Sequence, residues 1–201
     1  MGKGLIIFIE GDTEEAFYKK LVTQLHEYTP NKRFKMDTVK IKNLKGIGNY
    51  KKKAARVVRE MSLNQDTKFS VALCYDTDVF DLSPKPPITW SDVERVLMEI
   101  GAEKVIHIKA RHSIEDWFLL DKEGLCRYLR LPETTHIGNG TGIKIIEALF
   151  KKGHNVYIKG RTQDFVDSLD VNKIMISICS ELKSLCNELG IECTNQRKKC
   201  K

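Results

Sequence analysis

The chain has 201 residues, of which 41% are apolar and 30% charged, with a formal net charge of +7. This length suits one domain, and the composition is typical of a globular chain rather than a disordered one. The longest apolar run near the start, residues 5–9, is too short to cross a bilayer or to form the core of a secretory signal. We therefore expect a cytoplasmic protein with no membrane partner.

The positive charge is concentrated in one stretch of the sequence. Residues 32–59 contain eleven Lys or Arg and a single acid, Asp37, so the rest of the chain is slightly acidic. A basic block of this kind indicates contact with a polyanion such as a nucleic-acid backbone, although a solvated helix face explains it as well. The candidate nucleic-acid-binding residues are Lys42, Lys45, Lys51, Lys52, Lys53, Arg56 and Arg59.

The chain has six cysteines, and no two of them form a C-x-x-C pair. A structural zinc site is therefore poorly supported, and buried or incidental thiols in a reducing compartment are the expectation. The cysteines are Cys74, Cys126, Cys179, Cys186, Cys193 and Cys200.

The apolar pattern alternates between strands and helices in the first half of the chain. Predicted strands cover 5–10, 34–41, 69–75 and 104–109, and predicted helices run from a Thr13 N-cap to about His26, over 50–62, and over 92–100 behind a Ser91 cap. Nearly continuous apolar strands separated by helices favour a parallel sheet covered on both faces. The predicted fold class is α/β with a Rossmann-like core and a four-stranded, mainly parallel sheet.

The second half of the chain is predicted to be mostly helical. Helices are expected over 113–120, 122–130, 141–152 and 171–189, with a short extra strand over 156–159. Residues 1–112 would form the core, and residues 113–201 a helical extension that completes the same domain. Apolar residues of the last helix are predicted to be core rather than an interaction face: Ile174, Ile178, Leu182, Leu185 and Leu189.

Acidic residues follow three of the predicted strands. Glu10 ends the first strand, and Glu14 lies one helical turn further; Asp76 and Asp78 follow the third strand, and Glu115 follows the fourth. Ligands of parallel α/β sheets bind at the carboxyl ends of the strands. Carboxylates gathered there would repel one another unless a hard divalent cation such as Mg²⁺ neutralised them. Two such ions about 3.5–4 Å apart could clamp a phosphoryl group during in-line transfer.

These acids stand in motifs that resemble the Toprim domain. That family has a Glu-Gly after its first strand and an Asp-x-Asp after its third, as in Glu10-Gly11 and Asp76-Thr77-Asp78, and the match covers roughly residues 4–112. The segment 114–120 and Tyr157-Ile158-Lys159 extend a narrower resemblance, to about residue 168, to small OLD-like and RloB-like nucleases of bacterial anti-phage (abortive infection) loci.

The resemblance implies a metal-dependent endonuclease that hydrolyses phosphodiester bonds of DNA or RNA, tRNA included. It assigns Mg²⁺ or Mn²⁺ to Glu10, Glu14, Asp76, Asp78 and Glu115, with Lys159 stabilising charge on the phosphate, so that Glu10, Asp76, Asp78 and Lys159 would be catalytic. It also implies a partner, a separate ATPase of the AAA or ABC type, since the sequence holds no Walker motif.

Several alternatives stay open. Glu115 could instead cap its helix together with Ser113, and Lys159 could be an ordinary exposed residue. The whole chain could be a non-catalytic subunit that binds nucleic acid or an ATPase, or a primase-like nucleotidyltransferase. Homo-oligomerisation is left open too.

Overall fold

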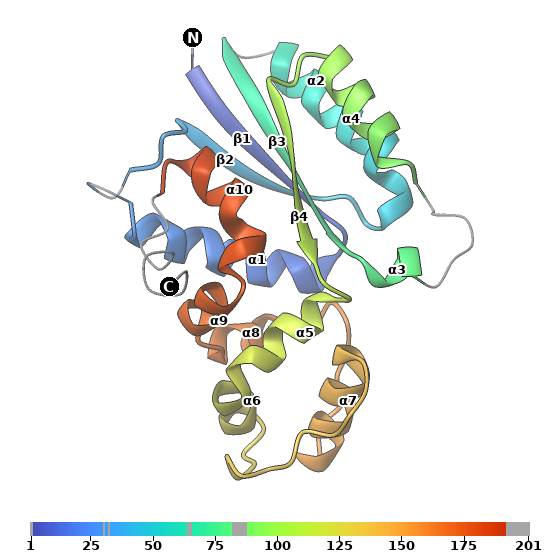
Figure 1. Ribbon diagram of the computed structural model, residues 1–201, viewed down its shortest axis with the longest axis vertical. Coiled ribbons are helices and arrows are strands. Elements are labelled where there is room, and N and C mark those ends of the chain that lie inside the picture. Colours follow the sequence, from blue (N-terminus) through green and yellow to red (C-terminus); the bar gives the residue numbers. More distant parts are fainter. Residues whose placement is uncertain (1, 30, 32, 64–65, 82–87, 192–201) are drawn as a thin grey trace.

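The computed structural model describes residues 2–29, 31, 33–63, 66–81 and 88–191. Its centre is a four-stranded, all-parallel sheet in the order β2-β1-β3-β4 (Figure 1). The strands are β1 (Gly2–Ile9), β2 (Thr38–Asn43), β3 (Thr67–Asp76) and β4 (Lys104–Ala110). The predicted α/β class with a Rossmann-like, four-stranded parallel sheet is confirmed.

The two central strands, β1 and β3, have the longest buried runs. Residues 4–9 of β1 and 69–76 of β3 are all buried, as expected for strands covered on both faces. The chain passes from β1 outward to β2 and then returns past β1 to β3. This reversal places a crevice at the carboxyl ends of β1 and β3, which is where ligands of open α/β sheets bind.

Helices cover both faces of the sheet (Figure 1). One face packs against α2 (Ala55–Leu63), α4 (Trp90–Glu99) and the π-helical turn η3 (Tyr50–Ala54), around buried Phe8 and Leu73. The other face packs against α1 (Asp12–Glu27), α9 (Val171–Ser177) and α10 (Cys179–Leu189). The short elements η2 (Ile47–Asn49) and α3 (Asp78–Asp81) follow β2 and β3.

The remaining helices lie beyond the carboxyl ends of the strands, at the bottom of the view in Figure 1. They are α5 (Ile114–Phe118), η4 (Leu119–Asp121), α6 (Lys122–Tyr128), α7 (Gly142–Lys152) and α8 (Gln163–Ser168). Their buried side chains, such as Phe118, Ile146 and Phe165, belong to the same hydrophobic cluster as Phe17 of α1. The extension and the sheet therefore share one core.

The predicted strand boundaries were partly wrong. The second strand begins at Thr38 rather than at residue 34, because the backbone N–H of Lys35 donates to Leu189 O of α10 instead of joining the sheet. No strand forms over 156–159, where Tyr157 is buried and the chain turns against the start of α1.

The helix predictions also need correction. The helix predicted over 171–189 is interrupted at Ile178, whose φ of −104° and ψ of 24° are not helical. Thr13 does not cap α1, because Gly11 precedes the helix and Thr13 lies inside it. Likewise α4 follows Thr89 rather than Ser91. The short helix α8 was not predicted.

The apolar residues of α9 and α10 are core, as predicted. Ile174, Ile178, Leu182, Leu185 and Leu189 are all buried in the main hydrophobic cluster. Within the described part of the chain, none of the helices combines the length and apolar character needed to span a membrane.

Candidate functional site

Glu10 and Asp76 meet at the crevice between β1 and β3. Glu10 follows the last residue of β1, and its Oε1 accepts a hydrogen bond from the backbone N–H of Asp76 at 3.0 Å. Asp76 in turn accepts, through Oδ1, the backbone N–H of Ile114 at 2.9 Å. Two strand ends and the start of α5 are thus tied together by carboxylates.

Glu115 is the most deeply buried acid of the site, with an exposed fraction of 0%. Its Oε1 accepts a hydrogen bond from Tyr157 Oη at 3.0 Å and lies 3.6 Å from Lys159 Nζ. Its Oε2 is buried and has no hydrogen-bond partner among the described residues. Because a buried carboxylate oxygen without a partner is costly, this atom is a place where a cation would be stabilising.

The capping alternative for Glu115 is wrong, because the neighbouring acid fills that role. Asp116 Oδ2 accepts hydrogen bonds from the Ser113 hydroxyl at 2.9 Å and from the Ser113 backbone N–H at 3.2 Å. This capping box leaves Glu115 pointing to Tyr157. A Cβ at Gly142 would lie 2.6 Å from Asp116 N, so only glycine lets α7 start this close to α5.

A cavity of about 300 Å³ opens beside these groups. Three of the predicted metal ligands, Glu10, Glu14 and Glu115, line it together with Lys159. The remaining lining residues are Gly11, Asp12, Thr13, Gly46 and Gly160. The cavity therefore brings together residues that are far apart in the sequence, such as Glu10 and Lys159, which are 149 positions apart. Asp76 and Asp78 are not among the lining residues.

The acids of the site raise one another's pKa values. Burial raises the pKa of Glu10 to about 7, and the nearby charges of Glu14 and Asp78 add to this, against the hydrogen bond from Asp76. Burial raises the pKa of Asp76 to about 9, with further contributions from the charges of Glu14, Glu10, Glu115 and Asp78. The pKa of Glu14 is also raised, chiefly by burial and then by Glu115. The five predicted ligands thus interact electrostatically as one group.

The donor set of this group suits a hard cation. All five side chains offer carboxylate oxygens, the ligands that Mg²⁺ prefers. Among the described residues, however, no three His, Cys, Asp or Glu side chains are arranged to hold one metal ion. Glu10, Glu14 and Glu115 line the cavity, and Asp76 and Asp78 lie outside its lining. Mg²⁺ keeps several of its waters when bound, so it needs few direct protein ligands.

The turn that carries Lys159 is fixed against α1. The backbone N–H of Gly160 donates to Thr13 Oγ1 at 3.0 Å, and Tyr157 reaches Glu115 from the same turn. Neither Thr13 nor Tyr157 was predicted to position the site. The Tyr-x-Lys pattern was the available signal for Tyr157, but only the fold shows that its hydroxyl meets a buried acid.

Most of the predicted basic contact residues are engaged within the protein. Lys45 pairs with Asp12, Lys51 lies 3.6 Å from Asp92, and Arg56 lies 3.6 Å from Glu60. Lys53 Nζ donates to Leu44 O at 3.1 Å. Four of the seven candidates have no carboxylate partner among the described residues: Lys42, Lys52, Lys53 and Arg59.

The cysteines add no chemistry that the structure describes. Cys74 and Cys126 are buried thiols, and burial raises the pKa of Cys74 to about 12, which keeps it protonated and unreactive. Cys193 and Cys200 lie outside the described residues.

Comparisons of the chain with protein-family models, with curated proteins and with solved structures find no match. The resemblance to Toprim nucleases therefore stays a prediction from the motifs, and function has to be argued from the site itself.

Proposed function

We propose that the chain is a metal-dependent nuclease of the Toprim type, similar to the OLD-like and RloB-like group. The observation that carries the proposal is the group of five mutually repelling acids at the carboxyl ends of the strands, with Lys159 at its edge. The pKa values of Glu10, Glu14 and Asp76 are raised, and acids of this kind favour a bound cation, which removes both the repulsion and the cost of burying charge.

Each residue has a role in this proposal. Glu10, Glu14, Asp76, Asp78 and Glu115 would hold Mg²⁺ or Mn²⁺, in one or two positions. The ion, when bound, would supply Lewis acidity at the phosphate and an activated water. The Lys159 ammonium, which lines the cavity beside Glu115, would stabilise the charge that develops on the phosphate oxygens.

The direct test is cleavage of DNA and RNA by purified protein with Mg²⁺ or Mn²⁺. We expect Glu10→Gln and Asp76→Asn to lower the rate at least 100-fold, an effect of the size found when one electrostatic interaction with a transition state is removed. Glu15→Gln is the matched control, because Glu15 follows Glu14 in the first turn of α1 but pairs with Lys19 at 2.7 Å. Equal cleavage by wild type and both site variants would exclude the proposal.

A non-catalytic nucleic-acid-binding subunit is the second candidate. It is favoured by the lack of a ready three-residue metal cluster among the described residues. Calorimetric titration with Mn²⁺ separates the two. If the chain is a nuclease, the wild-type protein should bind Mn²⁺ and Asp76→Asn should not. If it is a non-catalytic binding subunit, neither wild type nor Asp76→Asn should give heat of Mn²⁺ binding.

The proposal includes a role in anti-phage defence with a separate ATPase, which only the sequence resemblance supports. Its test is a nuclease assay with and without an AAA or ABC-type ATPase encoded beside this chain. A rate that depends on ATP and on that ATPase would support the partnership, and an unchanged rate would argue against it.

A further inference from the structure

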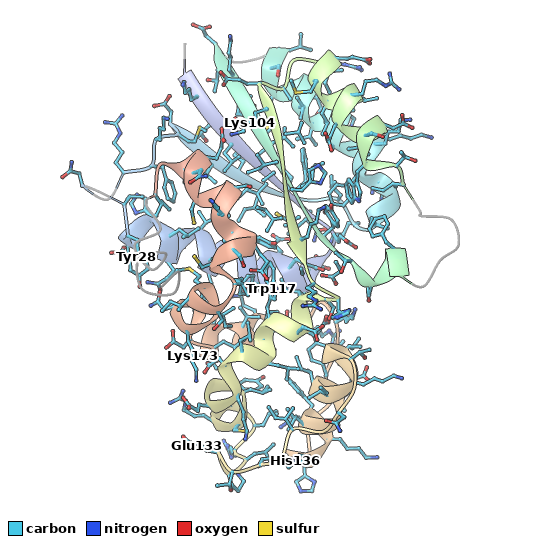
Figure 2. The ribbon with its side chains drawn as sticks, in the orientation of Figure 1. Tyr28, Lys104, Trp117, Glu133, His136 and Lys173 are labelled. Atoms are coloured by element: carbon cyan, nitrogen blue, oxygen red, sulfur yellow. The ribbon has the colours of Figure 1, made fainter. Side chains whose placement is uncertain are left out.

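A second and larger hollow lies in the helical extension. Its volume is about 680 Å³, compared with about 300 Å³ for the carboxylate cavity. Residues 128–131 at the end of α6 and 152–155 at the end of α7 line it. Figure 2 labels Glu133 and His136 at this end of the molecule, the bottom of the view. We call this feature the α6–α7 hollow.

The α6–α7 hollow carries positive charge and no carboxylate. Arg130, Lys152 and His154 contribute to its wall, and none of its eight lining residues is acidic. Lys152 Nζ donates to the neutral backbone oxygen of His136 at 3.1 Å. Neither Arg130 nor Lys152 has an ion-pair partner among the described residues. Unpaired cations around a concave surface concentrate field and attract anions.

An aromatic ring stands beside these cations. Tyr128 is 37% exposed, and its ring packs against Phe150 and Phe165 with centroid distances of 6.0 and 5.5 Å. A partly exposed ring that is held in place by two other rings can serve as a platform for stacking. Helix C-termini favour basic residues in any protein, but that preference explains neither the hollow nor the exposed ring. Cations beside an aromatic platform are typical of sites for single-stranded nucleic acid.

The aromatic cluster connects the hollow to the candidate active site. Phe150 also packs against Tyr157, with ring centroids 5.2 Å apart, and Tyr157 holds Glu115. The start of α7 touches Asp116, the residue after Glu115, and its end forms the hollow. The 11 residues of α7 span about 15 Å. That distance corresponds to about four or five nucleotides of a stacked strand.

We propose that the α6–α7 hollow binds single-stranded nucleic acid, with backbone phosphates at Arg130 and Lys152 and a base stacked on Tyr128. The inference deepens the proposed nuclease function: it rests on that function for the identity of the ligand and assigns the strand a binding site four or five nucleotides from the carboxylates. It also moves the main nucleic-acid contact away from residues 42–59, where several charges are already paired within the protein.

The test measures binding without cleavage. Full-length Asp76→Asn protein in EDTA is titrated into a fluorescent single strand of about 12 nucleotides, as DNA and as RNA, at several salt concentrations. We expect Arg130→Gln with Lys152→Gln to weaken binding about tenfold or more, and to lower the salt slope by about 0.7 for each phosphate that is no longer neutralised. Lys183→Gln, at an exposed lysine of α10, is the matched control and should bind like the parent.

Substitutions of Tyr128 test the stacking separately. Tyr128→Phe should bind like the parent, and Tyr128→Leu should bind about fivefold or more weakly, because leucine fills the space without offering a ring face. Thermal melts of each variant establish that it is folded. Unchanged affinity and salt slope in the double variant would overturn the inference, as would equally tight binding of a poly-glutamate peptide at the same residues.

The two proposals can fail independently. Suppose that the hollow variants lose binding but that Asp76→Asn, made in the wild-type protein, cleaves as fast as wild type. The α6–α7 hollow would then be supported as a binding site, and the proposed nuclease site would be excluded. If the hollow variants bind normally and Asp76→Asn abolishes cleavage, the nuclease site would be supported and the binding role of the α6–α7 hollow would be excluded.

Discussion

Glu115 has its two carboxylate oxygens in different environments. Tyr157 and Lys159 approach Oε1, and Oε2 is buried with no hydrogen-bond partner among the described residues. A hydrogen bond to one oxygen of a ligating carboxylate fixes the direction in which the other oxygen points. We infer that Tyr157 is a positioning residue, which would orient Glu115 toward the proposed cation.

The first prediction concerns this hydrogen bond. Tyr157→Phe keeps the ring in the aromatic cluster and removes only the donor to Glu115, so we expect Mn²⁺ affinity to fall about 10- to 100-fold. Calorimetric titration measures the affinity. Tyr128→Phe, which removes a hydroxyl from another ring of the same cluster, should leave it unchanged. Identical affinities for Tyr157→Phe and wild type would show that the hydrogen bond has no part in metal binding.

The second prediction is a pH dependence of stability without divalent ions. The pKa of Glu10 is raised from 4.5 to about 7 and that of Asp76 from 3.8 to about 9. The folded state binds these protons more tightly than the unfolded state. The contribution of the two groups to the free energy of unfolding is therefore greatest below pH 4. It is lost as the pH rises through 7 and 9.

Asp76→Asn tests this directly, since an amide oxygen can still accept the Ile114 N–H. In EDTA the melting temperature of the variant should exceed that of wild type at pH 9 and be close to it at pH 4. Each kcal/mol of added stability should raise the melting temperature by about 2–4 °C. Thermal unfolding followed by circular dichroism gives both values. A wild-type melting temperature that exceeded that of the variant at pH 9 would contradict the expectation.

At the scale of elements, the sequence predicts what depends on local pattern. The unbroken apolar runs of β1 and β3 predict buried parallel strands, and Glu10 and Asp76 at their ends predict where a ligand would bind. The turn at Tyr157 could not be predicted, because its conformation comes from Glu115 and Thr13, which are distant in sequence. Similarly, the late start of β2 depends on Leu189, which is distant in sequence. The capping role of Asp116 was readable, because Asp116 stands three residues after Ser113, at the position that a capping box requires.

The attachment of α10 to the sheet gives the third prediction. Glu188 of α10 accepts hydrogen bonds from the buried Ser70 hydroxyl of β3 at 2.7 Å and from Lys104 of β4 at 2.6 Å. Glu188→Ala leaves the Ser70 hydroxyl without its partner, so we expect a loss of about 1–3 kcal/mol in the free energy of unfolding. Urea denaturation at pH 7 measures this, and Lys183→Ala on the same helix should change it by less than about 0.5 kcal/mol.

The hydrogen bonds of Glu188 predict a pH dependence of stability that is opposite in sign to that of Asp76. Burial raises the pKa of Glu188, but the hydrogen bonds from Lys104 and Ser70 outweigh it and leave the pKa below 4.5. The contribution of Glu188 is therefore present above pH 4.5 and is lost as the pH falls through the lowered pKa. The difference in stability between Glu188→Ala and wild type should shrink in acid.

At the scale of the whole molecule, the net charge of +7 conceals a local excess of negative charge. At the carboxyl ends of the strands, the charges of four acids act on Asp76. Eleven of the basic residues, in contrast, are concentrated in residues 32–59. With this arrangement, a small cation bound among the acids would stabilise the folded protein, and the basic surface would attract a polyanion.

The fourth prediction follows from that arrangement. A divalent ion that binds only the folded protein should stabilise it by about 2.7 kcal/mol at a concentration 100 times its dissociation constant. Differential scanning fluorimetry should show a higher melting temperature in Mn²⁺ than in EDTA. Glu10→Gln and Asp76→Asn should lose most of that shift, and Glu15→Gln should retain it. A shift of equal size in all four proteins would mean that the ion binds elsewhere.

The turn at Tyr157–Gly160 has a consequence for the order in which the site is completed during synthesis. The ribosome synthesises the acids Glu10, Asp76 and Glu115 before Tyr157 and Lys159, which contact Glu115. The hydrogen bond from the Gly160 N–H to Thr13 likewise forms only after Gly160 has been added. A nascent chain that ends before Lys159 has the acids of the site without its lysine. The complete constellation therefore exists only once the turn that carries Tyr157 and Lys159 has been translated.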